Sequence, residues 1–162
     1  MATDAQTAVV TATAAFVRQE LVGNDASHDW NHIERVWRQA VSLATNSSLS
    51  PDEVHVVELA AILHDIADWK YSGSETAGVE QASAFLRGQG CDAALVQRVG
   101  WIIERVSFHD ELGRSEEERE AMKFDLSLAV VQDADRLDAI GAIGVARTLT
   151  FGGKKMVRCC TL

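Results

Sequence analysis

Apolar residues recur at helical spacing along nearly the whole chain. Between about Asp29 and Ala44 they fall at three- and four-residue intervals, which predicts one helix with a single apolar face. Few runs alternate between apolar and polar residues as a β-strand would, and no internal repeat is visible. The pattern therefore predicts an all-α fold of about six helices. Besides residues 29–44, we expect helices over about 5–22, from 51 onward, 75–87, 92–106 and 125–151.

Local signals refine two of these helices and one connecting segment. In Ser50-Pro51-Asp52-Glu53 the serine can cap a helix, the proline suits its first turn, and the glutamate completes a capping box. The last helix is expected to bend near Gly141 and Gly144. Residues 109–123 are rich in charge, so we expect a solvated loop with a helical piece.

The third predicted helix carries an unusual set of polar residues in the stretch AILHDIADW, residues 61–69. Apolar residues stand on both sides of His64 and Asp65, so this part of the helix is expected to be buried. A buried charge is costly unless it is paired, hydrogen-bonded or bound to a metal. A hydrogen-bonded structural pair in the core is one explanation, and a metal site is the other.

Composition and charge limit the classes of function. The chain has 162 residues, of which 47% are hydrophobic, and a single proline, which predicts one domain over residues 1–162. A formal net charge of −9 argues against broad binding to nucleic acid or to an anionic membrane. Three cysteines are too few for a disulfide framework. The first residues lack the charge pattern of a signal peptide, so we expect a cytoplasmic protein.

Histidine and aspartate gather in four clusters along the chain. They lie at residues 28–32, 64–68, 109–110 and 133–138. Imidazole and carboxylate ligands together suit manganese, iron, nickel, cobalt or zinc and, with more oxygen ligands, magnesium. The clusters other than residues 64–68 also have a simpler explanation, because a histidine at a helix start, a charged loop or an acidic helix face is often only solvated.

Three of these clusters resemble a known family. The segments HDWNHIERVW, LAAILHDIADW and VQDADRLDAIGAIGVAR, in this order, look like the H…HD…D pattern of the HD-domain superfamily of metal-dependent phosphohydrolases. The likeness is strongest to its small stand-alone members, some of which are nucleoside triphosphate pyrophosphohydrolases. It spans about residues 25–153. The resemblance implies a helical bundle built around a metal site.

Transferred by position, the resemblance implies that one divalent metal ion per chain is bound by His32, His64, Asp65 and Asp135. His28 and Asp29 would then lie around the ligands or at the mouth of the cleft. Helical spacing alone does not separate Asp135 from Asp133, so Asp133 is the alternative ligand and otherwise a neighbour of the site.

The resemblance also implies a reaction. Asp68, three residues after Asp65, would act as acid or base on a metal-activated water that hydrolyses a phosphoester or phosphoanhydride. Arg35, Lys70 and Arg136 are the positive groups expected to bind phosphate. The expected partner is a small phosphorylated substrate, with a nucleotide favoured, and a homodimer would suit so small a domain.

Two departures from the family support an alternative function. Many relatives carry a histidine where this chain has Val106, before Ser107 and Phe108. They also usually continue for several elements after the segment that matches TFGG, so this C-terminus is expected to be shortened. Both features are compatible with a catalytically impaired regulatory domain that binds a metal or a nucleotide without turning it over.

Overall fold

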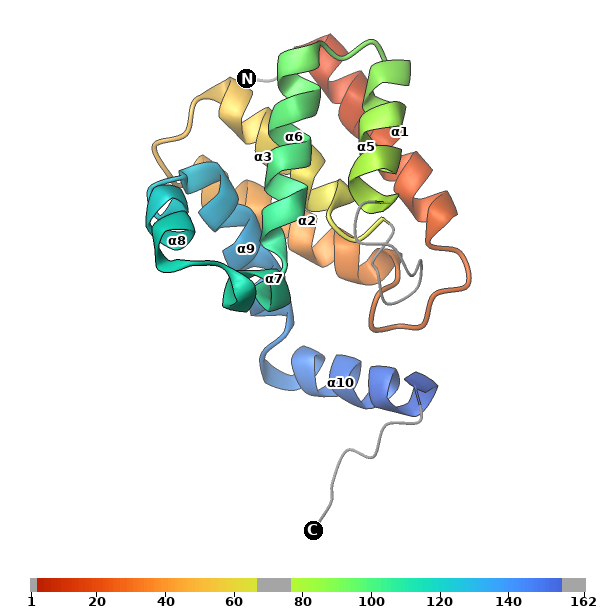
Figure 1. Ribbon diagram of the computed structural model, residues 1–162. Helices are drawn as coiled ribbons and strands as arrows, with labels where there is room; N and C mark the ends of the chain where they lie inside the picture. The colour runs from red at the N-terminus through yellow and green to blue at the C-terminus, as the bar shows by residue number, and fades with distance from the viewer. Residues whose placement is uncertain (1–2, 67–76, 156–162) are drawn as a thin grey trace.

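The computed structural model describes residues 3–66 and 77–155, and within these ranges the chain forms nine helices and no strand (Figure 1). The all-α prediction is confirmed. None of the helices in these ranges combines the length and the apolar character needed to cross a bilayer. The helices are α1 (Asp4–Glu20), α2 (Trp30–Thr45), α3 (Pro51–Leu63), α5 (Ala77–Gly88), α6 (Ala93–Val106), α7 (Phe108–Gly113), α8 (Glu116–Met122), α9 (Leu126–Asp138) and α10 (Gly141–Lys155).

Helix α3 forms the centre of the domain. It packs against α1, α2, α6 and α9, and its last five residues, 59–63, are fully buried. The start of α3 follows its sequence signal, since Ser50 accepts a hydrogen bond from the Glu53 N–H and the Glu53 carboxylate accepts one from the Ser50 N–H. Helices α2 and α9 also pack against each other. The three helices that carry the HD-like motifs therefore meet in one place.

Helix α3 is shorter than the sequence predicts. It ends at Leu63, His64 occupies its C-cap position, and residues 64–66 form a turn. His64 and Asp65 therefore stand where the chain leaves the core, and not in the middle of a buried helix. The remainder of the AILHDIADW stretch, including Asp68, lies outside the described residues, as does Lys70.

The predicted last helix is two helices, and the expectation of a single bent one is wrong. Helix α9 ends at Asp138, and α10 begins at Gly141, whose φ of 65° lies in the left-handed region that favours glycine. Gly144 packs so closely on the Ala139 carbonyl that a Cβ would not fit. Helix α10 continues to Lys155 and lies beyond the end of α9, which it contacts at its own start (Figure 1).

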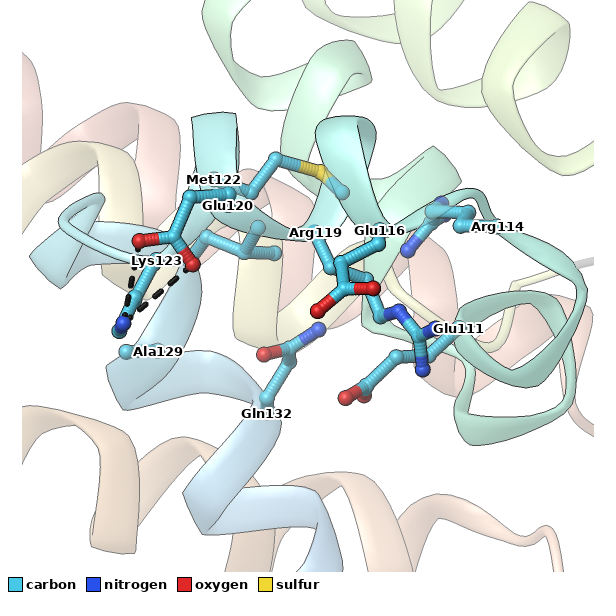
Figure 2. Close-up of a pocket in the computed structure, with 10 residues that line it drawn as sticks. Glu111, Arg114, Glu116, Arg119, Glu120, Met122, Lys123, Ala129 and Gln132 are labelled. Atoms are coloured by element: carbon cyan, nitrogen blue, oxygen red, sulfur yellow. Dashed lines mark hydrogen bonds and ion pairs between the residues drawn. The ribbon is translucent and has the colours of Figure 1, made fainter.

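The charged segment at 109–123 contains more helix than the sequence predicts. It forms α8 and most of α7, and Ser115 and Glu118 make a second capping box at the start of α8. A cavity of about 440 Å³ lies between α7, α8 and α9 (Figure 2). Charged side chains of both signs line it, including Glu116 and Arg119, and Gln132 contributes from α9.

Asp125 holds the start of α9 in two ways. Its carboxylate caps the helix by accepting a hydrogen bond of 2.9 Å from the Leu128 N–H, and it pairs with Arg98 of α6 at 2.7 Å. Burial alone would raise the pKa of Asp125, but the hydrogen bonds from Arg98 and the backbone lower it below its usual value. The ion pair thus links α6 to the helix that carries Asp135.

We expect Asp125→Asn to lower the free energy of unfolding at pH 7 by about 0.5–1 kcal/mol, the upper part of the range for ion pairs that water partly screens. Asparagine can still cap the helix, so the decrease in stability measures the contribution of the negative charge in the ion pair. Because the folded-state pKa is the lower one, this stabilisation is present above about pH 4 and disappears as the pH falls further. Urea unfolding at pH 7 and pH 3 measures the difference, with Asp92→Asn as the cap control. An equal difference at both pH values would contradict the role of the ion pair.

Candidate metal centre

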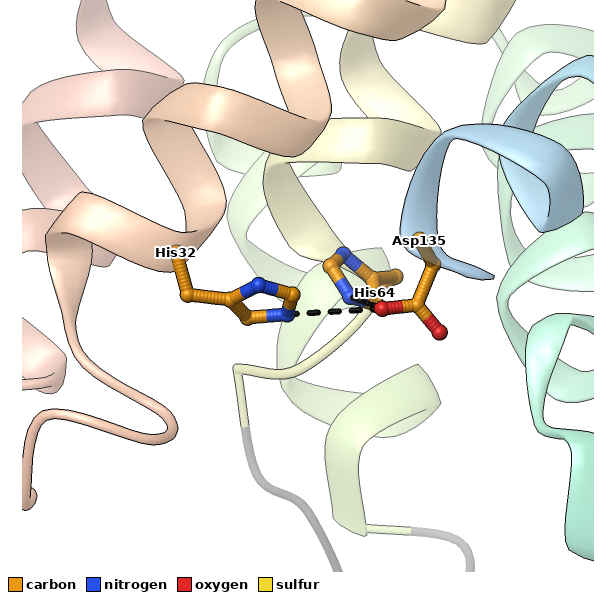
Figure 3. Close-up of side chains that lie close together, drawn as sticks. All are labelled: His32, His64 and Asp135. Atoms are coloured by element: carbon orange, nitrogen blue, oxygen red, sulfur yellow. Dashed lines mark ion pairs between the residues drawn. The ribbon is translucent and has the colours of Figure 1, made fainter. Parts of the chain in front are cut away.

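Three side chains from three different helices converge beside the core. His32 lies in the first turn of α2, His64 at the end of α3, and Asp135 near the end of α9. One ligand atom from each lies within 4.8 Å of the others (Figure 3). The structure therefore brings together three of the four expected ligands as a group that could hold a metal ion.

Asp65, the fourth expected ligand, faces the same two histidines. Its Oδ2 lies 3.5 Å from the Nε2 of His32 and 3.8 Å from the Nε2 of His64. The Oδ1 of Asp135 lies at comparable distances, 3.5 Å and 3.7 Å, from the same two nitrogens. All four separations exceed the usual length of an N–H···O hydrogen bond.

The two Nε2 atoms carry the clearest sign of a ligand site. Both are buried and have no hydrogen-bond partner among the described residues. An unsatisfied buried polar atom costs about 1–3 kcal/mol, so two in one place call for an explanation. A divalent cation between the imidazoles and the two carboxylates would satisfy all four groups, and the donor set suits a transition metal.

The other ring nitrogen of each histidine is already engaged. His64 Nδ1 donates to the carbonyl of Ala61 at 2.9 Å, and His32 Nδ1 donates to Oδ2 of Asp138 at 2.8 Å. A neutral imidazole that donates through Nδ1 keeps its lone pair on Nε2. Both rings are thus arranged as metal-ligating histidines usually are, with Nε2 available to the ion.

In this cluster, burial and the neighbouring charges shift the pKa values in opposite directions. Burial alone would lower the pKa of His64, but Asp65 and Asp135 raise it to about 9. Burial alone would raise the pKa of Asp65, but His64 and His32 hold it far below its usual range, and the pKa of Asp135 is lowered by the same neighbours. The carboxylates therefore favour a positive charge here, which a proton or a metal ion can supply.

The residues expected around the ligands have different places. Asp29 is the N-cap of α2, and its Oδ1 accepts a hydrogen bond from the backbone N–H of His32 at 3.2 Å. The His28 ring centroid lies 6.4 Å from that of His32, and its Nδ1 lies 2.7 Å from the hydroxyl of Ser27. Asp133 is exposed on α9 and does not join the cluster. Packing of α9 thus favours Asp135 as the ligand.

Two arginines expected to bind phosphate already have carboxylate partners. Arg35 donates from Nε and Nη2 to the two oxygens of Asp138, at 2.6 Å and 2.9 Å, and Arg136 pairs with Glu111. The guanidinium of Arg35 therefore holds a buried carboxylate in this structure, and its role in phosphate binding stays a prediction. The side chains of His109 and Asp110, which form the cluster outside the three family-like motifs, lie outside the described residues.

Asp138 belongs to the acidic cluster at 133–138, but the sequence assigned it no role at the site. Burial alone would raise the pKa of its carboxyl, but the hydrogen bonds from His32 and Arg35 hold that pKa far below its usual range. Its spacing was an available signal, because a residue three positions after Asp135 shares a helix face with it. Its partner His32, however, stands 106 positions earlier in the chain.

Comparisons with known proteins cover the part of the chain that carries the cluster. The sequence profile described as HD domain matches residues 29–140, which include every residue of the cluster. YpgQ of Bacillus subtilis is 34% identical over 140 residues, which cover 86% of this chain but only 64% of YpgQ.

Solved structures match along nearly the whole chain. A Lactobacillus plantarum protein has a TM-score of 0.78 at 30% identity and covers 99% of this chain and 68% of its own. A Bacillus thuringiensis HD-superfamily hydrolase has a TM-score of 0.69 at 34% identity, with coverages of 93% and 68%. YpgQ in complex with ADP has a TM-score of 0.67 at 30% identity, with coverages of 98% and 72%.

Proposed function

The chain belongs to the HD domain family, and we propose that it is a metal-dependent phosphohydrolase acting on a nucleotide. One observation carries the proposal: two buried imidazole Nε2 atoms without hydrogen-bond partners among the described residues face the carboxylates of Asp65 and Asp135. The solved relative described as an HD-superfamily hydrolase supports hydrolysis as the reaction class.

His32, His64, Asp65 and Asp135 are the residues that would hold one divalent ion. When bound, such an ion polarises a phosphoryl oxygen and lowers the pKa of a coordinated water. The chain itself supplies the orientation, because each histidine is fixed through its Nδ1 and each carboxylate comes from a packed helix or its end. In the proposed reaction, a carboxylate oxygen of Asp68 accepts the proton of the attacking water.

The proposed substrate class rests on a relative. YpgQ has been solved in complex with ADP, and its chain matches 98% of this one at 30% identity. A nucleotide with a phosphoanhydride bond is therefore the substrate class we propose. The aligned 140 residues span 64% of the length of YpgQ, so the activity and ligands of the whole relative come to this chain only as a proposal.

A regulatory domain that binds metal or nucleotide without hydrolysis is the second candidate. The observation that favours it is the pairing of Arg35 and Arg136 with Asp138 and Glu111, which leaves these two cations engaged and not directed at a substrate. An enzyme and a regulatory domain share the metal site, so they differ only in turnover.

Metal content followed by a hydrolysis assay tests the proposal. The purified protein, supplied with manganese and then desalted, is expected to hold about one metal ion per chain and to release phosphate or pyrophosphate from some member of a nucleotide panel. A chain that holds metal but releases neither product would support the regulatory domain. A chain that holds no metal after manganese has been supplied would overturn the metal-dependent phosphohydrolase, and a nucleotide-binding assay would then decide whether a regulatory domain remains.

A further inference from the structure

Asp138 is a buried carboxylate that contacts an unusually large number of basic side chains. It is the last residue of α9, is 2% exposed, and contacts three side chains from two other helices. Its Oδ1 accepts from Arg35, and its Oδ2 accepts from Arg35 and His32 of α2 and lies 3.3 Å from Nη1 of Arg147 on α10. Arg147 also donates to the backbone carbonyls of Ser27 and Asp138.

We propose that Asp138 is a positioning residue for the metal centre, which holds the His32 imidazole with Nδ1 protonated and Nε2 directed at Asp65 and Asp135. Arg35 and Arg147 in turn hold Asp138. The inference rests on the proposed function for its consequence, which is metal affinity. Its structural part, the tautomer and orientation of His32, stands on the geometry of the protein alone.

The location of His32 explains why a distant carboxylate is needed. His64 stands at the end of a helix, where carbonyl groups lack helical partners, so its Nδ1 reaches the carbonyl of Ala61 within its own helix. His32 stands in the first turn of α2, where the groups without helical partners are N–H donors. An Nδ1–H there requires an acceptor from another element, and Asp138 is that acceptor.

The arrangement of donors makes the carboxylate difficult to replace. Arg35 occupies both oxygens with the two arms of its fork, which prevents rotation of the carboxylate, and His32 shares one of these oxygens. The amide of an asparagine has the same shape, but its nitrogen would meet a donor whichever way the amide turned. Asp138→Asn should therefore change the hydrogen bonding with almost no change in volume.

The test compares the wild type with Asp138→Asn and Arg35→Lys, which keeps the charge but removes the fork. The control is Asp92→Asn, which removes the same charge at the cap of α6, where asparagine serves equally well. Circular dichroism and the Tm establish that each variant folds. Two readouts follow: the tautomer of His32 from ¹⁵N imidazole shifts of the metal-free protein, and the Kd for Mn²⁺ by titration calorimetry.

The wild type is expected to show His32 protonated at Nδ1. Asp138→Asn is expected to lose this single tautomer and to bind Mn²⁺ about 10–100-fold more weakly, the effect typical of lost hydrogen-bond partners of a ligand. Arg35→Lys should weaken binding less, and Asp92→Asn should match the wild type. If Asp138→Asn does not fold, the His32 tautomer and the Mn²⁺ affinity of Arg35→Lys test the proposal instead.

Two results separate this inference from the proposed function. If the wild type binds Mn²⁺ and Asp138→Asn keeps both its affinity and the His32 tautomer, Asp138 is only a packing residue and the inference is overturned. If the wild type binds no Mn²⁺, the proposed function fails. The tautomer then decides the structural part alone: its loss in Asp138→Asn supports the orienting role, and its retention overturns it.

Discussion

Asp135→Ala is expected to abolish stoichiometric metal binding while the protein stays folded. The carboxylate is 30% exposed and faces both imidazole Nε2 atoms, so its removal takes away a proposed charged ligand without opening the apolar core. Removal of a residue that only hydrogen-bonds to a ligand already weakens metal binding about 10–100-fold. Removal of a ligand itself should therefore weaken it by more than about 100-fold. Mn²⁺ titration calorimetry and elemental analysis after desalting measure the effect, and His64→Ala should behave in the same way.

Asp133→Ala is the matched comparison, because the sequence leaves this residue as the alternative ligand. Asp133 stands two residues earlier on α9 and is exposed, whereas Asp135 faces the histidines (Figure 3). We expect Asp133→Ala to hold as much metal as the wild type. A variant series in which Asp133→Ala loses the metal and Asp135→Ala keeps it would show that Asp133, and not Asp135, is the ligand.

Asp68→Asn is expected to separate the enzyme from the regulatory domain. A carboxylate that accepts a proton in the transition state typically contributes about 10²–10⁴-fold to the rate, so kcat should fall by that factor. The four proposed ligands are unchanged, and the metal content should therefore stay at the wild-type level. Phosphate and pyrophosphate release, measured under saturating nucleotide with added manganese, gives kcat.

The comparison with Asp135→Ala makes this result interpretable. Asp135→Ala should lose both metal and turnover, whereas Asp68→Asn should lose turnover alone. Wild-type turnover in Asp68→Asn would remove Asp68 from the proposed mechanism. A wild type that binds nucleotide and metal but shows no turnover, with binding unchanged in Asp68→Asn, would establish the regulatory domain.

Local signals in the sequence account for much of the helical structure. Ser50 and Glu53 mark the start of α3 and make the reciprocal hydrogen bonds that a capping box requires, and Asp92 caps α6 where the pattern begins. These contacts lie within a few residues of each other, so the sequence alone determines them. Helix ends were less predictable: apolar residues continue past Leu63, yet α3 stops there.

The break between α9 and α10 shows the same limit. The helical pattern continues across residues 125–151, and Gly141 and Gly144 indicate only a bend in one helix. The left-handed conformation of Gly141 and the close approach of Gly144 to the Ala139 carbonyl end one helix and begin another. That conformation places Arg147 of α10 beside Asp138, a contact for which the helical pattern holds no signal.

The sequence by itself determined the fold class, the cap at Ser50 and, through the order of its three motifs, the family and the candidate ligands, with Asp133 left as the alternative to Asp135. Only the tertiary structure decided the geometry of the site. Asp133 and Asp135 point to nearly opposite faces of a helix, and the sequence does not say which face meets the histidines. The packing of α9 against α2 and α3 directs Asp135 at them. The bond between His32 and Asp138 joins positions 106 residues apart, and such a contact exists only because packed helices bring distant parts of the chain together.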